Sequence, residues 1–368
     1  MYRITIVAGA RPNFMKIAPI IHEIKRQNAE GIKIDYRLVH TGQHYDKNMS
    51  GSFFEQLQIP DPHINLGCTG TSQAEQTASI MVAFEKDLLE HPSNLVMVVG
   101  DVTSTMACAV VAKKLHTKVA HVEGGIRSGD IEMPEEVNRI LTDSITDYFF
   151  TTTAKANENL EAQGVHKDQL FLVGNTMIDT LLKQQPNFIR PDFWNEIGLK
   201  NKNYFVLTMH RPSNVDAEEK LKEFLNEIIT HTRNLPILFP AHPRTKKILT
   251  KLNIENERLH IVEPLSYLEF NYLVENAKAV ITDSGGITEE ASVLKVPCIT
   301  LRDTTERPET INLGTNVLAG IEPKNIKPLL DRLFEGKWKK GKKIPLWDGQ
   351  TAERLLKALI EVEGIKEN

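Results

Sequence analysis

Residues 279–294, AVITDSGGITEEASVL, decide how this chain folds. The apolar run AVI leads into a turn that contains two glycines, and a helical pattern of apolar residues begins at Ile287. Glycines at such a turn let the backbone approach a ligand closely, and the free N–H groups at a helix start attract an anion. A strand, a turn and a helix in this order are typical of parallel α/β folds, whose ligands sit at the carboxyl ends of strands.

The polar residues of this stretch have two interpretations each. Ser284 either donates its hydroxyl to an anion held at Gly285 and Gly286, or merely caps the helix; the local pattern does not decide between them. Glu290, one turn into the helix, either accepts hydrogen bonds from ribose hydroxyls, as the acidic residue of dinucleotide folds does, or is an exposed helix carboxylate.

The rest of the chain repeats the alternation of short apolar strands and amphipathic helices. This alternation predicts parallel sheets covered by helices on both faces. The expected strands are residues 3–7, 35–40, 95–99, 119–122, 148–150 and 170–173 in the first half, and 204–208, 237–239, 260–262, 279–281 and 298–301 in the second.

The length of the chain predicts two domains. With 368 residues it exceeds the usual single-domain range of about 100 to 200 residues. We therefore expect an α/β fold of two Rossmann-like lobes, 1–180 and 181–350, facing across a cleft. A segment rich in Pro, Asn and charge, 183–203, is the expected hinge. The pattern leaves open which lobe receives the final amphipathic helix within 351–368; the first lobe is one option.

Composition excludes several classes of protein. A net charge of -4 gives no electrostatic reason to expect nucleic acid or an anionic membrane as a partner. The N-terminal residues do not read as a secretory signal, and no segment approaches the ~20 apolar residues of a membrane span. Cys68, Cys108 and Cys298 are widely separated and lack CxxC spacing, which argues against disulfides and a zinc site. A cytoplasmic location is expected.

In the first half, charged side chains follow the expected strands. Arg11 and Lys16 come after the first strand and are placed to bind phosphate; the GxGxxG signature of nicotinamide-dependent dehydrogenases is incomplete there. Asp101, Glu123 and Glu135 suit proton abstraction and donation. Asp101 could instead cap a helix and Glu135 favour a helix start, whereas Glu123 has no equally good structural explanation.

In the second half, two histidines follow consecutive strands, and an arginine lies close after each. His210 is followed by Arg211, and His242 by Pro243 and Arg244. A lone histidine is usually structural, but two such pairs favour binding of an anionic ligand or acid–base work. Neither HExxH nor a Cys/His cluster accompanies them, so a metal site is not predicted.

Together these motifs resemble the non-hydrolysing UDP-N-acetylglucosamine 2-epimerases. The resemblance implies a fold of the glycosyltransferase-B type, a homodimer, and neither a nicotinamide nor a metal cofactor. The matching blocks, in chain order, are GARPNFMK (9–16), HTGQH (40–44), GDVTST (100–105), HVEGGIRSGD (121–130), PEEVNR (134–139), MHRPSN (209–214), TDSGGITEEA (282–291) and RDTTERPE (302–309).

The resemblance also implies a role for each matching residue. The diphosphate would contact Ser284, Gly285, Gly286 and Arg11; the ribose would contact Glu290; the uracil would contact Leu265 and Phe270; Lys16 and Arg307 would line the nucleotide; and the catalytic set would be Asp101, Glu123, Glu135 and His210.

The implied reaction is an isomerisation that inverts C2 of a UDP-linked sugar. No carbonyl is attached to C2, so its hydrogen is not acidic until UDP departs from C1 and positive character spreads to C1 and the ring oxygen. A carboxylate then removes the C2 hydrogen to give 2-acetamidoglucal, and UDP adds back as a proton arrives on the other face. His210 would support the leaving phosphate or act as an acid. Which carboxylate serves which face stays open.

Several alternatives remain open in the sequence. Gln43 matches a regulatory position of the family, but His44, Tyr45 and Asp46 depart from its pattern, and activation by a second UDP-GlcNAc is left open. The HTGQHYD form also occurs in relatives that epimerise UDP-2,3-diacetamido-glucuronate or UDP-N-acetyl-fucosamine precursors. A hydrolysing epimerase that releases ManNAc, a glycosyltransferase of the same fold and a UDP-sugar-binding protein are further alternatives. The physiological sugar and the polysaccharide pathway are not specified.

Overall fold

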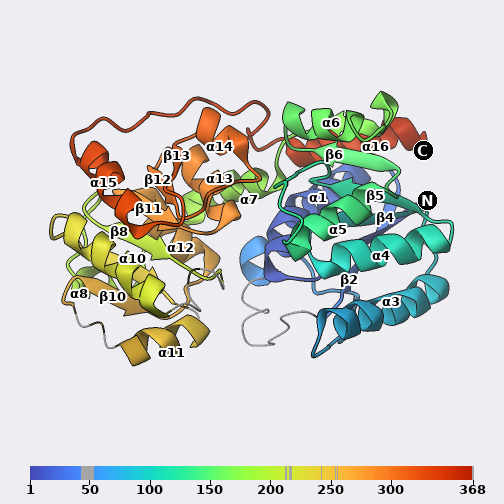
Figure 1. Cartoon of the computed structure of the whole chain (residues 1–368). Coiled ribbons are helices and arrows are strands. Elements are labelled where there is room, and N and C mark those ends of the chain that lie inside the picture. Colours follow the sequence, from blue (N-terminus) through green and yellow to red (C-terminus); the bar gives the residue numbers. More distant parts are fainter. Residues whose placement is uncertain are drawn as a thin grey trace. The chain divides into compact units, whose positions relative to one another are not determined.

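The computed structural model describes residues 1–42, 54–211, 214, 218–241, 243–252, 254 and 256–366, without the side chains of residues 243, 244 and 250 (Figure 1). It divides into two compact units: Met1–Lys183 with Pro345–Asn368, and Gln184–Ile344. Each unit holds one sheet whose strand pairs are all parallel among the described residues. The prediction of an α/β fold with two Rossmann-like units is confirmed.

The sheet of the first unit has the strand order β3-β2-β1-β4-β5-β6-β7. The order reverses between β1 and β4, which makes this the switch point of a doubly wound sheet. The central strand β4, LVMVV, is buried throughout, as a continuous apolar run covered on both faces should be. The strands are β1 (Tyr2–Ala8), β2 (Ile34–His40), β3 (Ile64–Asn65), β4 (Leu95–Val99), β5 (Lys118–Val122), β6 (Tyr148–Thr151) and β7 (Leu170–Leu172).

Helices connect these strands, and the last helix of the chain returns to pack on the first (Figure 1). The guanidinium of Arg354, on that last helix, donates to the carbonyl oxygens of Val173 and Leu346. The helices are α1 (Arg11–Ala29), α3 (Gln73–Glu90), α4 (Thr103–Lys114), α5 (Pro134–Asp143), α6 (Ala154–Glu161), α7 (Thr176–Gln184) and α16 (Thr351–Glu363).

The second unit repeats the arrangement, with the order β10-β9-β8-β11-β12-β13 and a switch point between β8 and β11. Its strands are β8 (Phe205–Thr208), β9 (Ile237–Pro240), β10 (Leu259–Val262), β11 (Ala279–Thr282), β12 (Cys298–Thr300) and β13 (Asn316–Leu318). Its helices are α8 (Phe193–Glu196), α10 (Glu218–His231), α11 (Pro243–Leu252), α12 (Tyr267–Asn276), α13 (Gly285–Val293), α14 (Pro308–Asn312) and α15 (Ile326–Phe334).

The structure differs from the predicted elements at the sheet edges and in the expected hinge. The short edge strands β3 and β13 were not predicted, because two or three residues carry too little periodicity. Within the expected hinge 183–203, Trp194 is buried and packs edge-on against Tyr204 at 5.5 Å between ring centroids. Trp194 and Leu199 of that segment therefore belong to the core of the second unit.

Candidate active site

Four of the predicted site residues lie at the switch points of the two sheets. In the first unit, Arg11 follows β1 and Asp101 follows the neighbouring strand β4; in the second, His210 follows β8 and Ser284 follows the neighbouring strand β11. Ligands of doubly wound sheets bind in the crevice that opens at this position. Each unit therefore carries a candidate binding region at the switch point of its own sheet.

The first helix, α1, begins at Arg11, directly after the strand-to-helix turn. Arg11 and Pro12 form its first turn, where proline is well tolerated, and the Arg11 side chain is exposed. Asn13, which sequence reasoning did not single out, closes the strand-to-helix turn: its Oδ1 accepts from the N–H groups of Gly9 (3.0 Å) and Ala10 (2.9 Å). Arg11 thus projects from a helix start whose preceding backbone is fixed.

Lys16 and Glu123 form a buried ion pair with an Nζ–Oε2 distance of 2.7 Å. Lys16 is buried, so this pair is not a surface salt bridge. Gly100 makes room for the pair, since a Cβ at this position, where φ is +70°, would lie 3.2 Å from the Lys16 Nζ. A cation at this distance favours the ionised form of the Glu123 carboxylate.

Glu123 also has an unusual backbone conformation. Its φ is +72°, in the left-handed region that residues other than glycine rarely adopt. Its N–H donates to the carbonyl of Phe150 at 2.9 Å, which holds the turn at the end of β5 against β6. Backbone strain of this kind persists only where surrounding contacts maintain it, and it is found most often at functional sites.

Asp101 is bound by a side chain from α5 and does not cap α4. Arg139 donates to its Oδ2 through Nε at 3.1 Å and Nη2 at 2.5 Å, and the residue at the N-cap of α4 is Val102. Arg139 also donates to Glu136 at 2.8 Å. Glu135, the neighbour predicted to be catalytic, lies exposed in the first turn of α5. Asp101 is thus bound by the middle of α5, while Glu135 lies in the first turn of the same helix.

In the second unit, His210 is oriented by Asp283. The imidazole Nδ1 lies 2.7 Å from Asp283 Oδ1; the carboxylate is fully buried, while the His210 side chain is 59% exposed. Asp283 also accepts from the backbone N–H groups of His210 and Arg211 and from the Asn214 amide. Burial alone would raise the pKa of Asp283, but these donors, the His210 side chain first among them, lower it, so the carboxylate is ionised. Because the carboxylate binds Nδ1 of His210, the outer nitrogen, Nε2, is left to contact a ligand.

The glycine turn at the start of α13 leaves its serine hydroxyl uncommitted to the helix. Ser284 is the N-cap residue, yet its side chain makes no capping hydrogen bond. Its N–H donates to Thr282 Oγ1 at 3.0 Å. The capping interpretation of the hydroxyl is therefore not what the structure shows, and the N-terminal turn of α13 remains an anion-binding feature.

Glu290 is buried in α13, so the exposed-carboxylate alternative is wrong. The hydroxyl of Tyr267, on α12, donates to its Oε1 at 2.9 Å. Burial raises the pKa of Glu290 to about 7, although the Tyr267 hydroxyl partly opposes that rise. Tyr267 was missed by sequence reasoning, and no local pattern marks it.

The segment that follows β12 carries the arginines of two arginine–carboxylate pairs. Arg307 binds Glu289 at 2.6 Å, and Arg302 binds Glu306 at 2.7 Å, all four side chains being largely buried. Burial would raise the pKa of Glu306, but the arginines lower it to about 2. A Cβ at Gly285 would lie 2.8 Å from Glu306 Oε1, so a side chain at this position would have to displace the Glu306 carboxylate.

The remaining predicted contacts lie on or near α12, or outside the described residues. Leu265 and Phe270 are half-buried and pack on the core of the second unit, so each keeps an exposed apolar surface. Gln43 and His242 lie outside the residues that the structure describes.

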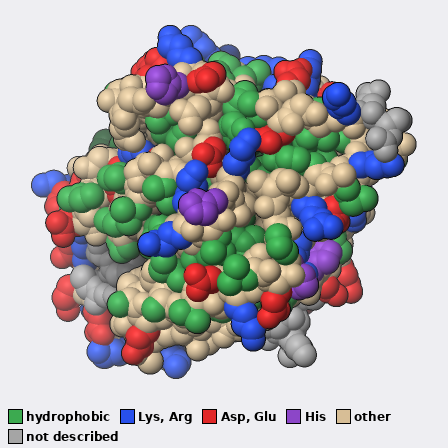
Figure 2. All heavy atoms as spheres, turned by 90° about the vertical axis from the view of Figure 1, so that its right-hand side faces the viewer, with side chains coloured by type: hydrophobic (Ala, Val, Ile, Leu, Met, Phe, Trp, Pro, Cys, Tyr) green, Lys and Arg blue, Asp and Glu red, His purple; other side chains and the backbone are tan. Residues whose placement is uncertain are grey.

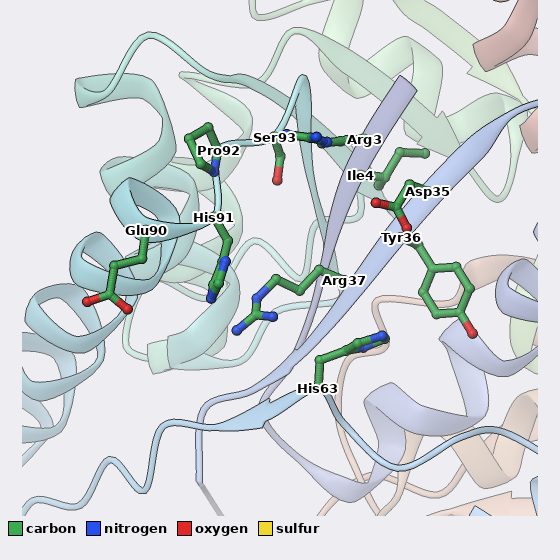
Figure 3. A pocket seen from close by; sticks show the side chains of 10 residues that line it. All are labelled: Arg3, Ile4, Asp35, Tyr36, Arg37, His63, Glu90, His91, Pro92 and Ser93. Carbon is green, nitrogen blue, oxygen red and sulfur yellow. The ribbon is translucent and has the colours of Figure 1, made fainter. Parts of the chain in front are cut away.

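A pocket of about 320 Å³ lies at the other end of the first sheet, near the beginnings of β1 and β2 (Figure 3). Arg37 extends into it beside His91, with its guanidinium bound to Asp87 at 2.7 Å. Because ligands of such sheets bind at the carboxyl ends of strands, this pocket is not part of the candidate site. Its lining residues are Arg3, Ile4, Asp35, Tyr36, Arg37, His63, Glu90, His91, Pro92 and Ser93.

The described residues hold neither a candidate metal-binding cluster nor a candidate membrane-spanning helix. In that part of the chain, no cluster of three or more His, Cys, Asp or Glu side chains is arranged to hold a metal ion. Across the same residues, no helix has the length and hydropathy needed to span a bilayer.

These features define an α/β protein of two doubly wound units, with acidic side chains after β4 and β5 of one sheet and a glycine turn after β11 of the other. A model of the family described as UDP-N-acetylglucosamine 2-epimerase matches residues 24–360, and the chain belongs to this family.

Similar proteins agree with this assignment. A UDP-N-acetylglucosamine 2-epimerase from Methanocaldococcus jannaschii is 40% identical over 97% of this chain and 98% of its own. The crystal structure of the UDP-GlcNAc 2-epimerase from that organism, in complex with UDP-GlcNAc and UDP, matches with a TM-score of 0.88 at 40% identity, over 98% of this chain and 99% of that one. A UDP-2,3-diacetamido-2,3-dideoxy-D-glucuronate 2-epimerase from Pseudomonas aeruginosa is 38% identical over 86% of this chain and 88% of its own.

Proposed function

We propose that this protein interconverts UDP-N-acetylglucosamine and UDP-N-acetylmannosamine by eliminating UDP to 2-acetamidoglucal and adding it back. The observation that carries the proposal is the buried Lys16–Glu123 pair at the first switch point. It supplies an ionised carboxylate at the carboxyl end of β5, in a chain whose relatives include UDP-N-acetylglucosamine 2-epimerases. The reaction uses side chains alone and needs no cofactor.

The second unit is assigned to the nucleotide. The N–H groups at Gly285 and Gly286, with the Ser284 hydroxyl, would bind the diphosphate, because a helix N-terminus favours negative charge. Arg11 and Arg307 would add positive charge. Glu290 would accept from the ribose hydroxyls in place of the Tyr267 hydroxyl.

The remaining contacts of the second unit are assigned to the uracil base and to the departing phosphate. Leu265 and Phe270 offer apolar surface for the uracil, and His242 is proposed as a further contact to the ligand. His210, held by Asp283 through Nδ1, would present its outer nitrogen to the departing phosphate, either as a donor that stabilises the leaving group or as an acid.

The first unit is assigned to the proton transfers. Glu123 begins as a carboxylate because Lys16 lies 2.7 Å away, and a carboxylate can accept the C2 proton once UDP has left C1. Asp101 and Glu135 are the other two groups available for proton delivery to the opposite face. Loss of UDP before proton removal explains why a weak base suffices at a carbon that carries no adjacent carbonyl.

The identity of the sugar has one specific competitor. The Pseudomonas aeruginosa relative that is 38% identical acts, by its name, on UDP-2,3-diacetamido-2,3-dideoxy-D-glucuronate. We favour UDP-N-acetylglucosamine, because the Methanocaldococcus jannaschii relative of that activity is the more similar of the two over more of the chain. Supplying both sugars in parallel decides between them.

The decisive experiment is incubation with UDP-GlcNAc in deuterated water, followed by NMR. We expect deuterium at C2 in a mixture of UDP-GlcNAc and UDP-ManNAc, without net release of ManNAc. Accumulation of free ManNAc and UDP would indicate a hydrolysing enzyme, and an unchanged sugar would favour a transferase, a binding protein or another substrate.

A single substitution tests the role of Glu123. Glu123→Gln should abolish C2 exchange, because the amide cannot accept the proton, while UDP binding measured by calorimetry stays within about threefold of wild type. Exchange that persists in this variant would show that another group is the base.

We also propose that the protein is a homodimer joined through the first unit. Val82 and Leu89 lie seven residues apart on one face of α3 and are 70% and 62% exposed; Val137, Ile140 and Leu141 form an exposed apolar stripe on α5. Both helices pack against α4, so they belong to one side of the unit. Figure 2 shows one side of this unit, where hydrophobic side chains lie on the surface between charged ones. Apolar surface of this kind favours a partner subunit.

A further inference from the structure

His121, the residue two positions before Glu123, is fully buried in β5 and contacts an oxygen through each ring nitrogen. Its Nε2 lies 2.8 Å from the carbonyl oxygen of Gly100, and its Nδ1 lies 2.6 Å from Asp143 Oδ1. A carbonyl oxygen can only accept a hydrogen bond, so Nε2 carries a proton.

The second nitrogen must carry a proton as well. Asp143 is fully buried, and its other oxygen accepts from the Gly125 N–H at 3.0 Å and pairs with Arg127 at 2.6 Å. The Arg127 guanidinium at this distance favours the ionised form of the Asp143 carboxylate. An ionised carboxylate only accepts, so Nδ1 donates to it, and the ring is an imidazolium.

These contacts surround the two strand ends that carry the acidic groups. Gly100 immediately precedes Asp101, and its carbonyl is fixed by the imidazolium. Gly125 follows Glu123 by two residues, has a φ of +79°, and is fixed by the carboxylate of Asp143. The Glu123 backbone, at a φ of +72°, is therefore held on both sides.

One helix supplies both anchors. Asp143 is the last residue of α5, while Arg139, one turn earlier, binds the Asp101 side chain. Asn138 donates to the Asp101 carbonyl at 2.9 Å. Helix α5 is thus bonded to Asp101 directly and to the Glu123 turn through Asp143.

We propose that His121 is a buried imidazolium that, together with Asp143, positions Asp101 and Glu123 for proton transfer at C2. His121 is a positioning residue: it contacts the backbone beside the acidic groups and no reacting atom. The part of this proposal that concerns proton transfer rests on the function proposed above. The charge state of the ring does not.

The charge state is tested on the full-length wild-type protein without substrate. Two-dimensional 1H–15N NMR of the histidine rings at pH 7.5, assigned with His121→Gln, should show one-bond N–H correlations at both nitrogens of His121. Protection from solvent makes both protons observable. A spectrum in which only one His121 nitrogen carries a proton would overturn the proposal.

The positioning role is tested by kinetics of His121→Gln and His121→Asn, each of which keeps one neutral donor. Displacing a base by about 1 Å can cost on the order of 100-fold in rate, so kcat should fall by up to about that factor. KM and the UDP dissociation constant should stay within about threefold. Active sites are counted by the stoichiometry of UDP binding, so that misfolded protein does not lower the apparent kcat.

An isotope effect separates positioning from a purely structural role. With substrate deuterated at C2, the isotope effect on kcat should be larger in both variants than in wild type, because proton removal becomes more rate-limiting. A lower kcat with an unchanged isotope effect would refute the positioning role. Absence of C2 exchange in wild type would refute the proposed function instead, and leave the imidazolium standing.

Discussion

Glu290 shows how burial of one side chain sets a charge state. Its carboxylate is enclosed in the second unit, and the hydrogen bonds of the Tyr267 hydroxyl, at 2.9 Å, and of the Asn271 side chain do not offset the loss of water around it. Burial raises the pKa of Glu290 to about 7 from an ordinary value of 4.5. The group is thus protonated in part near neutral pH, whereas the nearby Asp283, which has several donors, is ionised.

This difference predicts a pH-dependent stability. Between pH 4.5 and about 7 the folded protein keeps the Glu290 proton that the unfolded chain releases, so the free energy of unfolding falls as pH rises. Glu290→Gln removes this loss. At about 1.4 kcal/mol per pKa unit, the variant should gain about 2 to 3 kcal/mol relative to wild type between pH 5 and pH 8 in urea denaturation. Parallel pH profiles would contradict the assigned burial effect.

Ser284 and Ser72 are both N-cap residues, and they separate ligand binding from helix capping. Ser72 accepts from the Glu75 N–H at 3.1 Å, whereas Ser284 makes no capping bond. Ser72→Ala should cost about 1 kcal/mol of stability and leave UDP affinity unchanged. Ser284→Ala should change stability by less than about 0.5 kcal/mol and weaken UDP binding about tenfold, the loss of one good hydrogen bond. The reverse pattern would show that Ser284 is only a cap.

At the scale of elements, α16 completes the first unit although it is the last helix of the chain. Its buried face includes Leu355, and its start is fixed by the Ala352 N–H, which donates to Asp179 Oδ2 at 2.8 Å. The sequence showed an amphipathic helix but could not show its partner. Packing on α1 is decided by apolar surfaces that are distant in the chain.

Two substitutions by alanine on α16 test this packing. Leu355→Ala should lower the free energy of unfolding by about 2 to 5 kcal/mol, as expected for a fully buried leucine. The matched control is Val362→Ala on the same helix, at a side chain that is 39% exposed, which should change it by less than about 1 kcal/mol. Stability is measured by thermal and urea denaturation. If the two substitutions lowered it equally, the buried face of α16 would contribute no more than its exposed face.

At the scale of the whole molecule, the proposed dimer accounts for the apolar surface on α3 and α5. Leu89→Lys together with Val82→Glu places charges in that surface and should convert a mass near twice 41.6 kDa into the monomer mass, measured by light scattering on a size-exclusion column. The control Glu158→Lys makes a charge change on another helix of the same unit, α6, at a side chain that is 65% exposed, and should leave the mass unchanged. A wild-type protein of monomer mass at micromolar concentration would rule out a stable dimer.

The sequence by itself determined the alternation of strands and helices, the parallel sheets and the positions of the residues that follow the strands. These features depend on local periodicity and on glycine turns such as Gly285–Gly286, which short segments encode completely. It also identified Glu123, for which it offered no good structural explanation, but it could not show the left-handed backbone of that residue or its pairing with Lys16.

Only the tertiary structure decided which partners fix the functional groups. The pairs Arg139–Asp101, Asp283–His210 and Asp143–His121 join residues 22 to 73 positions apart, and no local pattern encodes them. The burial of Glu290 and the missing capping bond of Ser284 likewise depend on neighbouring elements. The physical reason is the same in each case: charge state and side-chain orientation depend on what surrounds a group in space, and that is set when distant segments pack together.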